Sequence, residues 1–136
     1  MERERLTETD VAMLAIELAG IFNEHNVAEG VRIYFNNMCM TGSSLQDIKK
    51  DEKGSTYTEF ANDDLITVIF DGTPLYKVLN HELYEPWSKI DTSVIKDMRK
   101  LFKKYGVYYE YGDFWNFSVY EEPLEKEKPK TIKLKF

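Results

Sequence analysis

The sequence predicts an α+β fold, a single domain over residues 1–136 in which two helices pack on one face of a mainly antiparallel sheet. Two amphipathic segments with clear start signals predict the helices, and short β-branched and aromatic runs between turn residues predict the strands. A chain of 136 residues has the usual size of one domain and is long enough to bury a core.

The first helix is predicted to begin after Thr7. The Thr7 hydroxyl can cap the open amides of the first turn, and Asp10 occupies the third helical position. Apolar residues then recur at the 3.6-residue period of a helix, which predicts one buried stripe. Its members are Val11, Leu14, Ala15, Leu18, Ile21 and Phe22. Asn26 or the Glu29-Gly30 pair is expected to end this helix.

The next segments are predicted to be a strand and a long loop. In "VRIYFNNMCM" (31–40), Val31, Ile33 and Phe35 alternate with other residues, as in one half-buried strand. The stretch 41–55 is polar and has no period, which predicts a loop, either irregular or with a helical turn at "SSLQDIKK".

Residues 65–80 are predicted to form a strand and a short helix. Leu65 to Phe70 is a β-rich run, and Asp71-Gly72 is a strong hairpin signal. Pro74 has no amide hydrogen for a ladder, so a second strand is the weaker alternative. We favour a short helix over "PLYKVLN" that begins at Pro74, with Thr73 as its cap.

The second long helix has equally clear boundaries. Asp91 is the expected cap, and Gly106 supplies the left-handed residue that ends a helix. The predicted buried face has the helical period and consists of Ile95, Met98, Leu101, Phe102 and Tyr105.

The stretch "VYYEYGDFWNFSVY" (107–120) is rich in rings and predicts a hairpin that turns at Gly112-Asp113. Alternation along the second strand places Trp115, Phe117 and Val119 on one face, which we expect to pack on the helices. The last residues, "TIKLKF" (131–136), also alternate and predict an additional strand.

The charge is unevenly distributed. The net charge is −6, and residues 123–136 carry five Lys against two Glu, so the preceding body is strongly acidic. An acidic body argues against direct binding of nucleic acid, which depends on Lys and Arg at the phosphates. Cys39 is the only cysteine, which is typical of a cytoplasmic protein, and no segment is long and apolar enough for a membrane helix. The sequence leaves the oligomeric state open.

No residue pattern in the sequence establishes a catalytic site, a metal site or a cofactor site, and we expect no cofactor. The carboxylates Asp63, Asp64 and Asp71 flank a predicted strand, and such groups hold Mg²⁺ in nucleases. Asp is also common in turns, because its carboxylate hydrogen-bonds to its own backbone, and this explains the three residues without a metal. A metal-dependent, nuclease-like enzyme is therefore kept as the alternative to a binding protein. His25, His81 and Cys39 have no spacing typical of a nucleophile and its base.

The order "PLYKVLN" and then "LFKKYGVYYEYGDFWNFSVY", within residues 65–120, resembles small uncharacterised proteins encoded by phages and mobile elements. This resemblance implies a setting rather than a site, because accessory genes of this type often encode inhibitors of host defence, including anti-CRISPR proteins. Such inhibitors commonly occupy a surface of their partner, sometimes as acidic substitutes for DNA.

We therefore expect a non-catalytic inhibitor that occupies a basic, nucleic-acid-handling surface of a partner protein. A structural or dimerising protein is a further alternative. The candidate contact residues are acidic or aromatic and flank the connector after residue 80 and the last hairpin. They are Glu82, Glu85, Tyr108, Glu110, Tyr111, Asp113, Phe114, Glu121 and Glu122.

Overall fold

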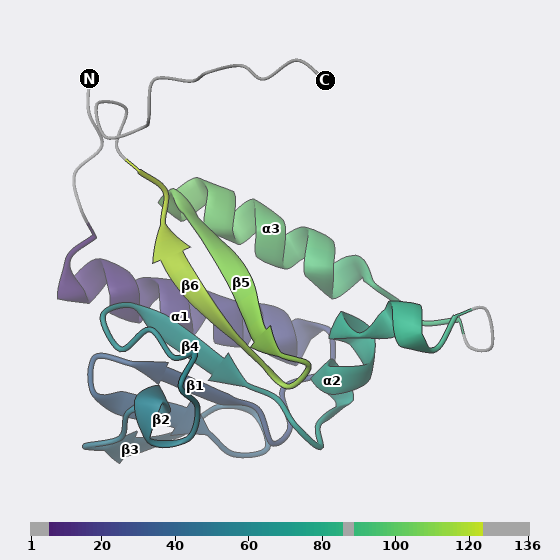
Figure 1. The fold of residues 1–136 in the computed structure, drawn as a ribbon, viewed down its shortest axis with the longest axis horizontal. Coiled ribbons are helices and arrows are strands. Elements are labelled where there is room, and N and C mark those ends of the chain that lie inside the picture. The colour runs from purple at the N-terminus through teal and green to yellow at the C-terminus, as the bar shows by residue number, and fades with distance from the viewer. Residues whose placement is uncertain (1–5, 86–88, 124–136) are drawn as a thin grey trace.

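The computed structural model describes residues 6–85 and 89–123, and a six-stranded antiparallel sheet forms its centre (Figure 1). The helices are α1 (Glu8–Glu24), α2 (Pro74–Leu79) and α3 (Ser93–Tyr105), with 3-10 turns η1 (Gly54–Thr56) and η2 (His81–Leu83). The strands are β1 (Arg32–Phe35), β2 (Met38–Thr41), β3 (Asp47–Lys50), β4 (Ile66–Ile69), β5 (Val107–Asp113) and β6 (Asn116–Glu121). Their order is β3-β2-β1-β4-β6-β5, so β3 and β5 are the edges. The predicted α+β class is confirmed.

The long helices α1 and α3 contact each other and cover one face of the sheet (Figure 1). Helix α1 begins as predicted, because the Thr7 hydroxyl accepts the Asp10 amide and the Asp10 carboxylate accepts the Thr7 amide. Helix α3 ends at Gly106, whose φ of 69° is left-handed, as predicted. The core between helices and sheet includes Leu14, Leu18, Phe22, Ile33, Val68, Phe70, Phe102 and Phe117.

The segment 31–40 is a hairpin and not the single strand that its alternation predicts. Strands β1 and β2 pair with Phe35 opposite Met38, which leaves Asn36 and Asn37 as a two-residue turn. Both asparagines have positive φ, 47° and 63°, as a turn of this hand requires. The missed signal is the Asn-Asn pair, since asparagine adopts left-handed φ more readily than most residues.

Strand β3 lies within the stretch predicted to be a loop, so that prediction is wrong for residues 47–50. All four side chains of β3 are exposed, and β3 is an edge strand on the side of the sheet away from α3 (Figure 1). An exposed edge strand needs no alternation of apolar and polar residues, and the sequence therefore carries no periodic signal for it.

The predictions for residues 65–80 are confirmed, with a difference at the cap. Strand β4 is followed by α2, which begins at Pro74. The Thr73 hydroxyl does not cap α2, because it donates to the Phe70 carbonyl at 2.6 Å.

Helix α3 begins one residue later than predicted, at Ser93. The Asp91 carboxylate still accepts the Ser93 amide at 2.9 Å and its hydroxyl at 2.7 Å. These two hydrogen bonds hold the pKa of Asp91 below its ordinary value.

The β5–β6 hairpin turns two residues later than predicted. Asp113 pairs with Asn116, so Phe114 and Trp115 form the turn, and a bulge between Tyr111 and Asp113 absorbs the shift. Phe117 remains in the helix-facing core, as predicted.

Trp115 is therefore not in the helix-facing core, and that prediction is wrong. A turn residue does not follow the alternation of the strand, and Trp115 packs on the opposite face of the sheet. Its neighbours there are Tyr34, Cys39 and Ile69.

This second face is covered by the connection between β3 and β4, residues 51–65. The Asn62 amide donates to the Thr67 hydroxyl at 2.8 Å, and the Ser118 hydroxyl donates to the Phe60 carbonyl at 2.9 Å. Unlike Thr67 and Ser118, Asn116 has a buried side chain whose two polar atoms form no hydrogen bond with the described residues. The second face thus combines this apolar cluster with buried polar side chains.

The predicted strand over 131–136 lies outside the described residues and stays a prediction. Among the residues that are described, no helix has the length and apolarity to cross a membrane.

Candidate protein-docking surface

The three aspartates of the enzyme alternative do not come together. Asp63 and Asp64 precede β4, whereas Asp71 follows it, so they lie at opposite ends of that strand. Asp63 accepts the Ser55 amide at 3.2 Å, and Asp71 lies 3.4 Å from the Arg32 guanidinium. Within residues 6–85 and 89–123, no three His, Cys, Asp or Glu side chains are placed to hold a metal ion.

The histidines and the cysteine also lie in separate environments. His25 caps the end of α1, and its Nε2 is 2.6 Å from the Asp97 carboxylate of α3. His81 lies 3.3 Å from Glu85 in the connector. Cys39 is buried against Tyr34, and burial raises the pKa of its thiol, which keeps it in the less reactive protonated form.

By contrast, large apolar side chains are exposed at the turn of the β5–β6 hairpin and in η2, the 3-10 turn that follows α2. Phe114 is 63% exposed, and Tyr111 is 47% exposed on the preceding strand. Leu83, in η2, is 60% exposed. The tip of this hairpin lies beside α2 (Figure 1). Exposed apolar groups that cluster in this way mark interaction sites more often than isolated ones do.

Hydrogen bonds between α2 and the hairpin fix this arrangement. The Asn80 side-chain amide donates to the Phe114 carbonyl and to the Tyr76 carbonyl, both at 2.8 Å. The Tyr111 hydroxyl donates to the Leu79 carbonyl at 3.4 Å. Between these elements lies a hollow of about 330 Å³, which Leu79, Tyr111 and Phe114 help to line. Two hydrogen bonds therefore join the hairpin turn to the end of α2.

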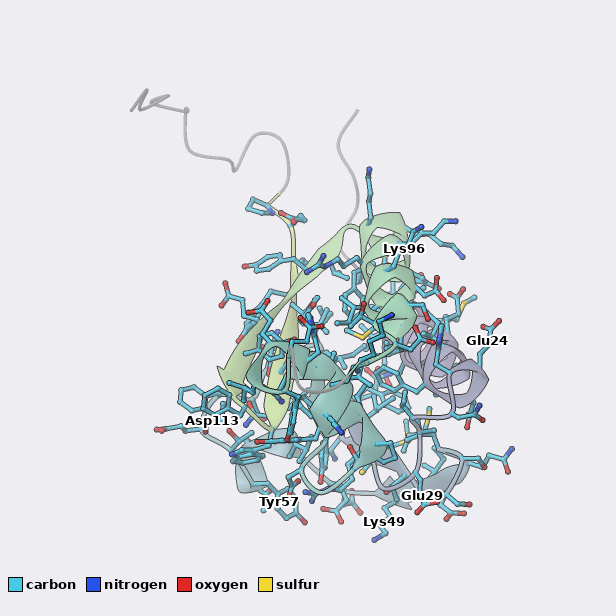
Figure 2. The ribbon with its side chains drawn as sticks, turned by 90° about the vertical axis from the view of Figure 1, so that its right-hand side faces the viewer. Glu24, Glu29, Lys49, Tyr57, Lys96 and Asp113 are labelled. Atoms are coloured by element: carbon cyan, nitrogen blue, oxygen red, sulfur yellow. The ribbon has the colours of Figure 1, made fainter. Side chains whose placement is uncertain are left out.

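Exposed carboxylates lie on the same hairpin and connector as these apolar side chains. Glu110 and Asp113 are exposed on β5, and Glu82 and Glu85 are exposed in the connector after α2. Burial and the neighbouring Tyr109 raise the pKa of Tyr111, with a smaller contribution from Glu82. Asp113 lies at the outer end of the hairpin, on the opposite side of the molecule from Glu24 (Figure 2).

We call these seven residues the tip surface. Its apolar centre is Leu83, Tyr111 and Phe114, and its acidic rim is Glu82, Glu85, Glu110 and Asp113. Six of the seven are among the nine residues selected from the sequence. Leu83 was missed, because nothing in an irregular connector indicates whether a leucine is buried.

The other three selected residues lie at the opposite end of the hairpin. Tyr108 stacks on Tyr120, with ring centroids 5.7 Å apart, and is 36% exposed. The Glu121 carboxylate accepts the Leu6 amide at 3.0 Å, and the Glu122 amide donates to the Gly106 carbonyl at 2.9 Å. Glu121 is therefore part of the structural connection between the N-terminal residues and β6.

Comparison with known proteins identifies no similar family, protein or structure. No protein-family model matches the chain, and no curated protein or solved structure is significantly similar to it.

Proposed function

We propose that this protein is a non-catalytic inhibitor that binds a basic, nucleic-acid-handling surface of a partner protein through the tip surface. The observation that carries this proposal is the exposure of Leu83, Tyr111 and Phe114 on a hairpin and a connector that also carry four exposed carboxylates. Aromatic anchors inside a polar rim are the usual composition of a protein–protein interface.

The two parts of the tip surface have different tasks in binding. Burial of the apolar centre removes its side chains from water, which stabilises the complex and slows dissociation. The carboxylates attract a basic surface at a distance, so they raise the association rate and select the partner.

The sequence resemblance suggests which partner has such a surface. Inhibitors of host defence commonly act on nucleases, whose nucleic-acid-binding clefts are rich in Lys and Arg. An acidic protein with the tip surface would compete with nucleic acid for such a cleft. The alternative of a metal-dependent enzyme has less support, because its aspartates are distributed over both ends of β4.

The test is capture of the partner from an extract of the native host, with wild-type protein and two double variants as bait. Leu83→Ala/Phe114→Ala removes two apolar side chains that are 60% and 63% exposed. Met13→Ala/Ile16→Ala removes two that are 53% and 60% exposed on α1, and is the matched control. We expect a nucleic-acid-binding protein to be retained by wild type and the control, and lost with the tip variant.

Both variants should melt close to wild type, since none of the four side chains belongs to the core. Retention of the same partner by the tip variant, or its loss with the control, would contradict the proposal. So would turnover of a substrate that is abolished by Asp64→Ala, because it would establish the enzyme alternative.

A further inference from the structure

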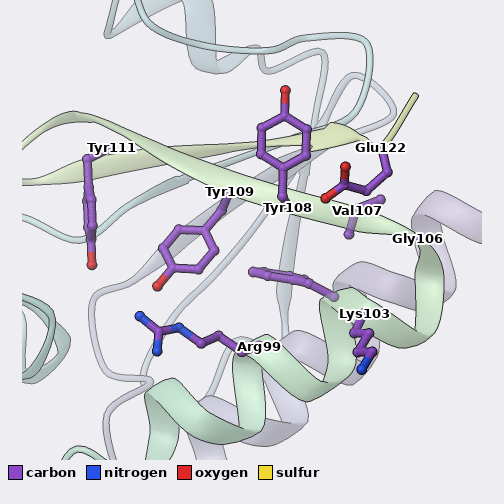
Figure 3. Close-up of a pocket in the computed structure, with 9 residues that line it drawn as sticks. Arg99, Lys103, Gly106, Val107, Tyr108, Tyr109, Tyr111 and Glu122 are labelled. Atoms are coloured by element: carbon purple, nitrogen blue, oxygen red, sulfur yellow. The ribbon is translucent and has the colours of Figure 1, made fainter. Parts of the chain in front are cut away.

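A second surface with the opposite charge lies between α3 and β5. The side chains of Arg99, Phe102, Lys103, Val107 and Tyr109 help to line a groove there of about 530 Å³. Figure 3 shows Tyr109 pointing from the strand toward the helix, while Tyr108 points to the other side of the sheet. The groove therefore has an apolar and aromatic floor and a basic wall on α3, and the acidic Glu122 lines it beside Val107.

The strand that borders this groove has an edge that no described strand occupies. Among residues 6–85 and 89–123, β5 is the last strand of the sheet, and β6 is the one strand that pairs with it. The Glu122 amide donates to the Gly106 carbonyl, and pairs in an antiparallel ladder alternate between bonded and non-bonded. This alternation turns the amide and carbonyl groups of Val107 and Tyr109 away from β6. No backbone hydrogen bond from these two residues toward the open edge is formed within the described part of the chain.

The wall of the groove carries two cations. Arg99 and Lys103 are four residues apart in α3 and so lie on the same side of the helix. Both are exposed, and neither forms an ion pair with any residue that the structure describes. Figure 3 shows the two side chains on the helix side of the groove, with Glu122 near the start of β5. Such a pair is notable in a chain with a net charge of −6.

We propose that this groove binds an extended acidic peptide segment of a partner protein, which adds to the edge of β5 as a further strand. The backbone of the peptide hydrogen-bonds to the outward amides and carbonyls of Val107 and Tyr109. Side chains alternate along a strand, so every second residue of the peptide faces α3. Acidic residues at these positions meet Arg99 and Lys103, and the intervening residues face away from the helix.

Charge and backbone chemistry distinguish this occupant from others. The chain's own residues 124–136 carry five Lys and two Glu, which have the same overall sign as the wall. Two copies joined through β5 would bring two basic walls together. A nucleic acid would satisfy the cations but leave the open amides and carbonyls of β5 without a strand partner.

The first experiment uses a fluorescein-labelled peptide, acetyl-Gly-Glu-Val-Glu-Val-Glu-Gly-amide, and measures its anisotropy with the full chain. Arg99→Glu/Lys103→Glu should weaken binding by about tenfold or more, since it replaces attraction by repulsion at both contacts. Lys49→Glu/Lys50→Glu on β3 changes the net charge equally and should change affinity by less than about twofold. Figure 2 shows Lys49 far from α3, on which Lys96 lies.

The second experiment tests strand addition itself. The same peptide with N-methyl groups at alternate residues loses donors to β5, and one of the two possible registers of methylation should abolish binding. In NMR spectra the unmodified peptide should shift the amides of Val107 and Tyr109 and protect them from hydrogen exchange.

Several results would overturn this proposal. These are no binding of the acidic peptide, equal weakening by the two charge variants, or full affinity of both methylated peptides. Tighter binding of a single-stranded oligonucleotide that depends on Arg99 and Lys103 would assign the groove to nucleic acid. If the reversal variant does not fold, Arg99→Gln/Lys103→Gln gives the same comparison with a smaller expected loss. The tip variants leave the groove intact, so these results are independent of the proposed function.

Discussion

Phe117 and Trp115 are two positions apart in one hairpin, yet their environments differ strongly. Phe117 is fully buried between sheet and helices, with ring centroids 5.1 Å from Tyr109, 5.9 Å from Phe70 and 6.4 Å from Phe102. Trp115 is only half-buried at the turn, on the opposite face. Two-residue alternation would make these side chains equivalent, and the position of the turn makes them different.

Replacement of each residue by Ala measures this difference. Phe117→Ala should lower the free energy of unfolding by about 3–5 kcal/mol, because it leaves a cavity in the core. Trp115→Ala should cost clearly less, because the turn can relax and water already reaches the indole. Urea denaturation followed by circular dichroism gives both values. Equal losses would show that the indole is as essential to packing as the Phe117 ring.

At the scale of elements, polar contacts as well as apolar packing join α1 to α3. The Tyr105 hydroxyl donates to the Glu17 carboxylate, and the Lys104 ammonium lies 3.1 Å from it. The pKa of Glu17 is lowered by the hydrogen bond from Tyr105 first and by Lys104 second. Burial and Glu17 raise the pKa of Tyr105 to about 12. The contact thus favours ionised Glu17 and neutral Tyr105.

This contact makes part of the stability pH-dependent. The pKa of Glu17 is lower in the folded state than in the unfolded state. The contribution of Glu17 to the free energy of unfolding is therefore complete at pH values above the ordinary pKa of Glu, and it is lost as the pH falls through the pKa of the folded state. Tyr105→Phe should lower the free energy of unfolding by about 0.5–1 kcal/mol at pH 7, a modest value because Glu17 is partly exposed. The difference from wild type should shrink at acidic pH.

Urea denaturation at neutral and acidic pH makes the comparison. Tyr76→Phe is the control, because the Tyr76 hydroxyl forms no hydrogen bond with the residues that the structure describes. A loss for Tyr105→Phe that is the same at both pH values would mean that the hydroxyl does not act through the Glu17 charge.

Elements with local signals were predictable from the sequence, and elements defined by distant contacts were not. Thr7, Pro74 and Gly106 mark helix boundaries through their own backbone chemistry, and all three are where they were expected. Strand β3 is stabilised by pairing with β2, and its exposed side chains form no sequence pattern that would predict this pairing. The last turn likewise lies two residues later than predicted, because the bulge between Tyr111 and Asp113 depends on how β5 pairs with β6.

At the scale of the whole molecule, β5 brings two unlike surfaces together. Its turn carries the acidic tip surface, and its open edge borders the basic groove with Arg99 and Lys103. The sequence placed Glu110 and Asp113 on the hairpin, and so predicted part of the first surface. It did not indicate the groove, because only the tertiary structure places α3 along the edge of β5.

The last prediction concerns the charge of the tip surface. Glu110→Lys/Asp113→Lys should slow association with the partner isolated in the capture experiment. It should also make the association rate less dependent on salt, because dissolved salt screens the attraction between exposed charges that this variant removes. Glu24→Lys/Glu29→Lys changes the net charge equally, and Figure 2 shows both residues far from Asp113. Glu121 is not altered, because its carboxylate holds the Leu6 amide.

Stopped-flow association rates from about 50 to 500 mM NaCl provide the measurement, over which the screening length falls severalfold. Wild type and the Glu24/Glu29 control should slow steeply with salt, and the tip reversal should start slow and change little. The dissociation rate should respond mainly to Phe114→Ala, since burial of the ring stabilises the formed complex. If the two reversals slow association equally, the partner senses only the overall charge of the protein, and the acidic rim has no specific role.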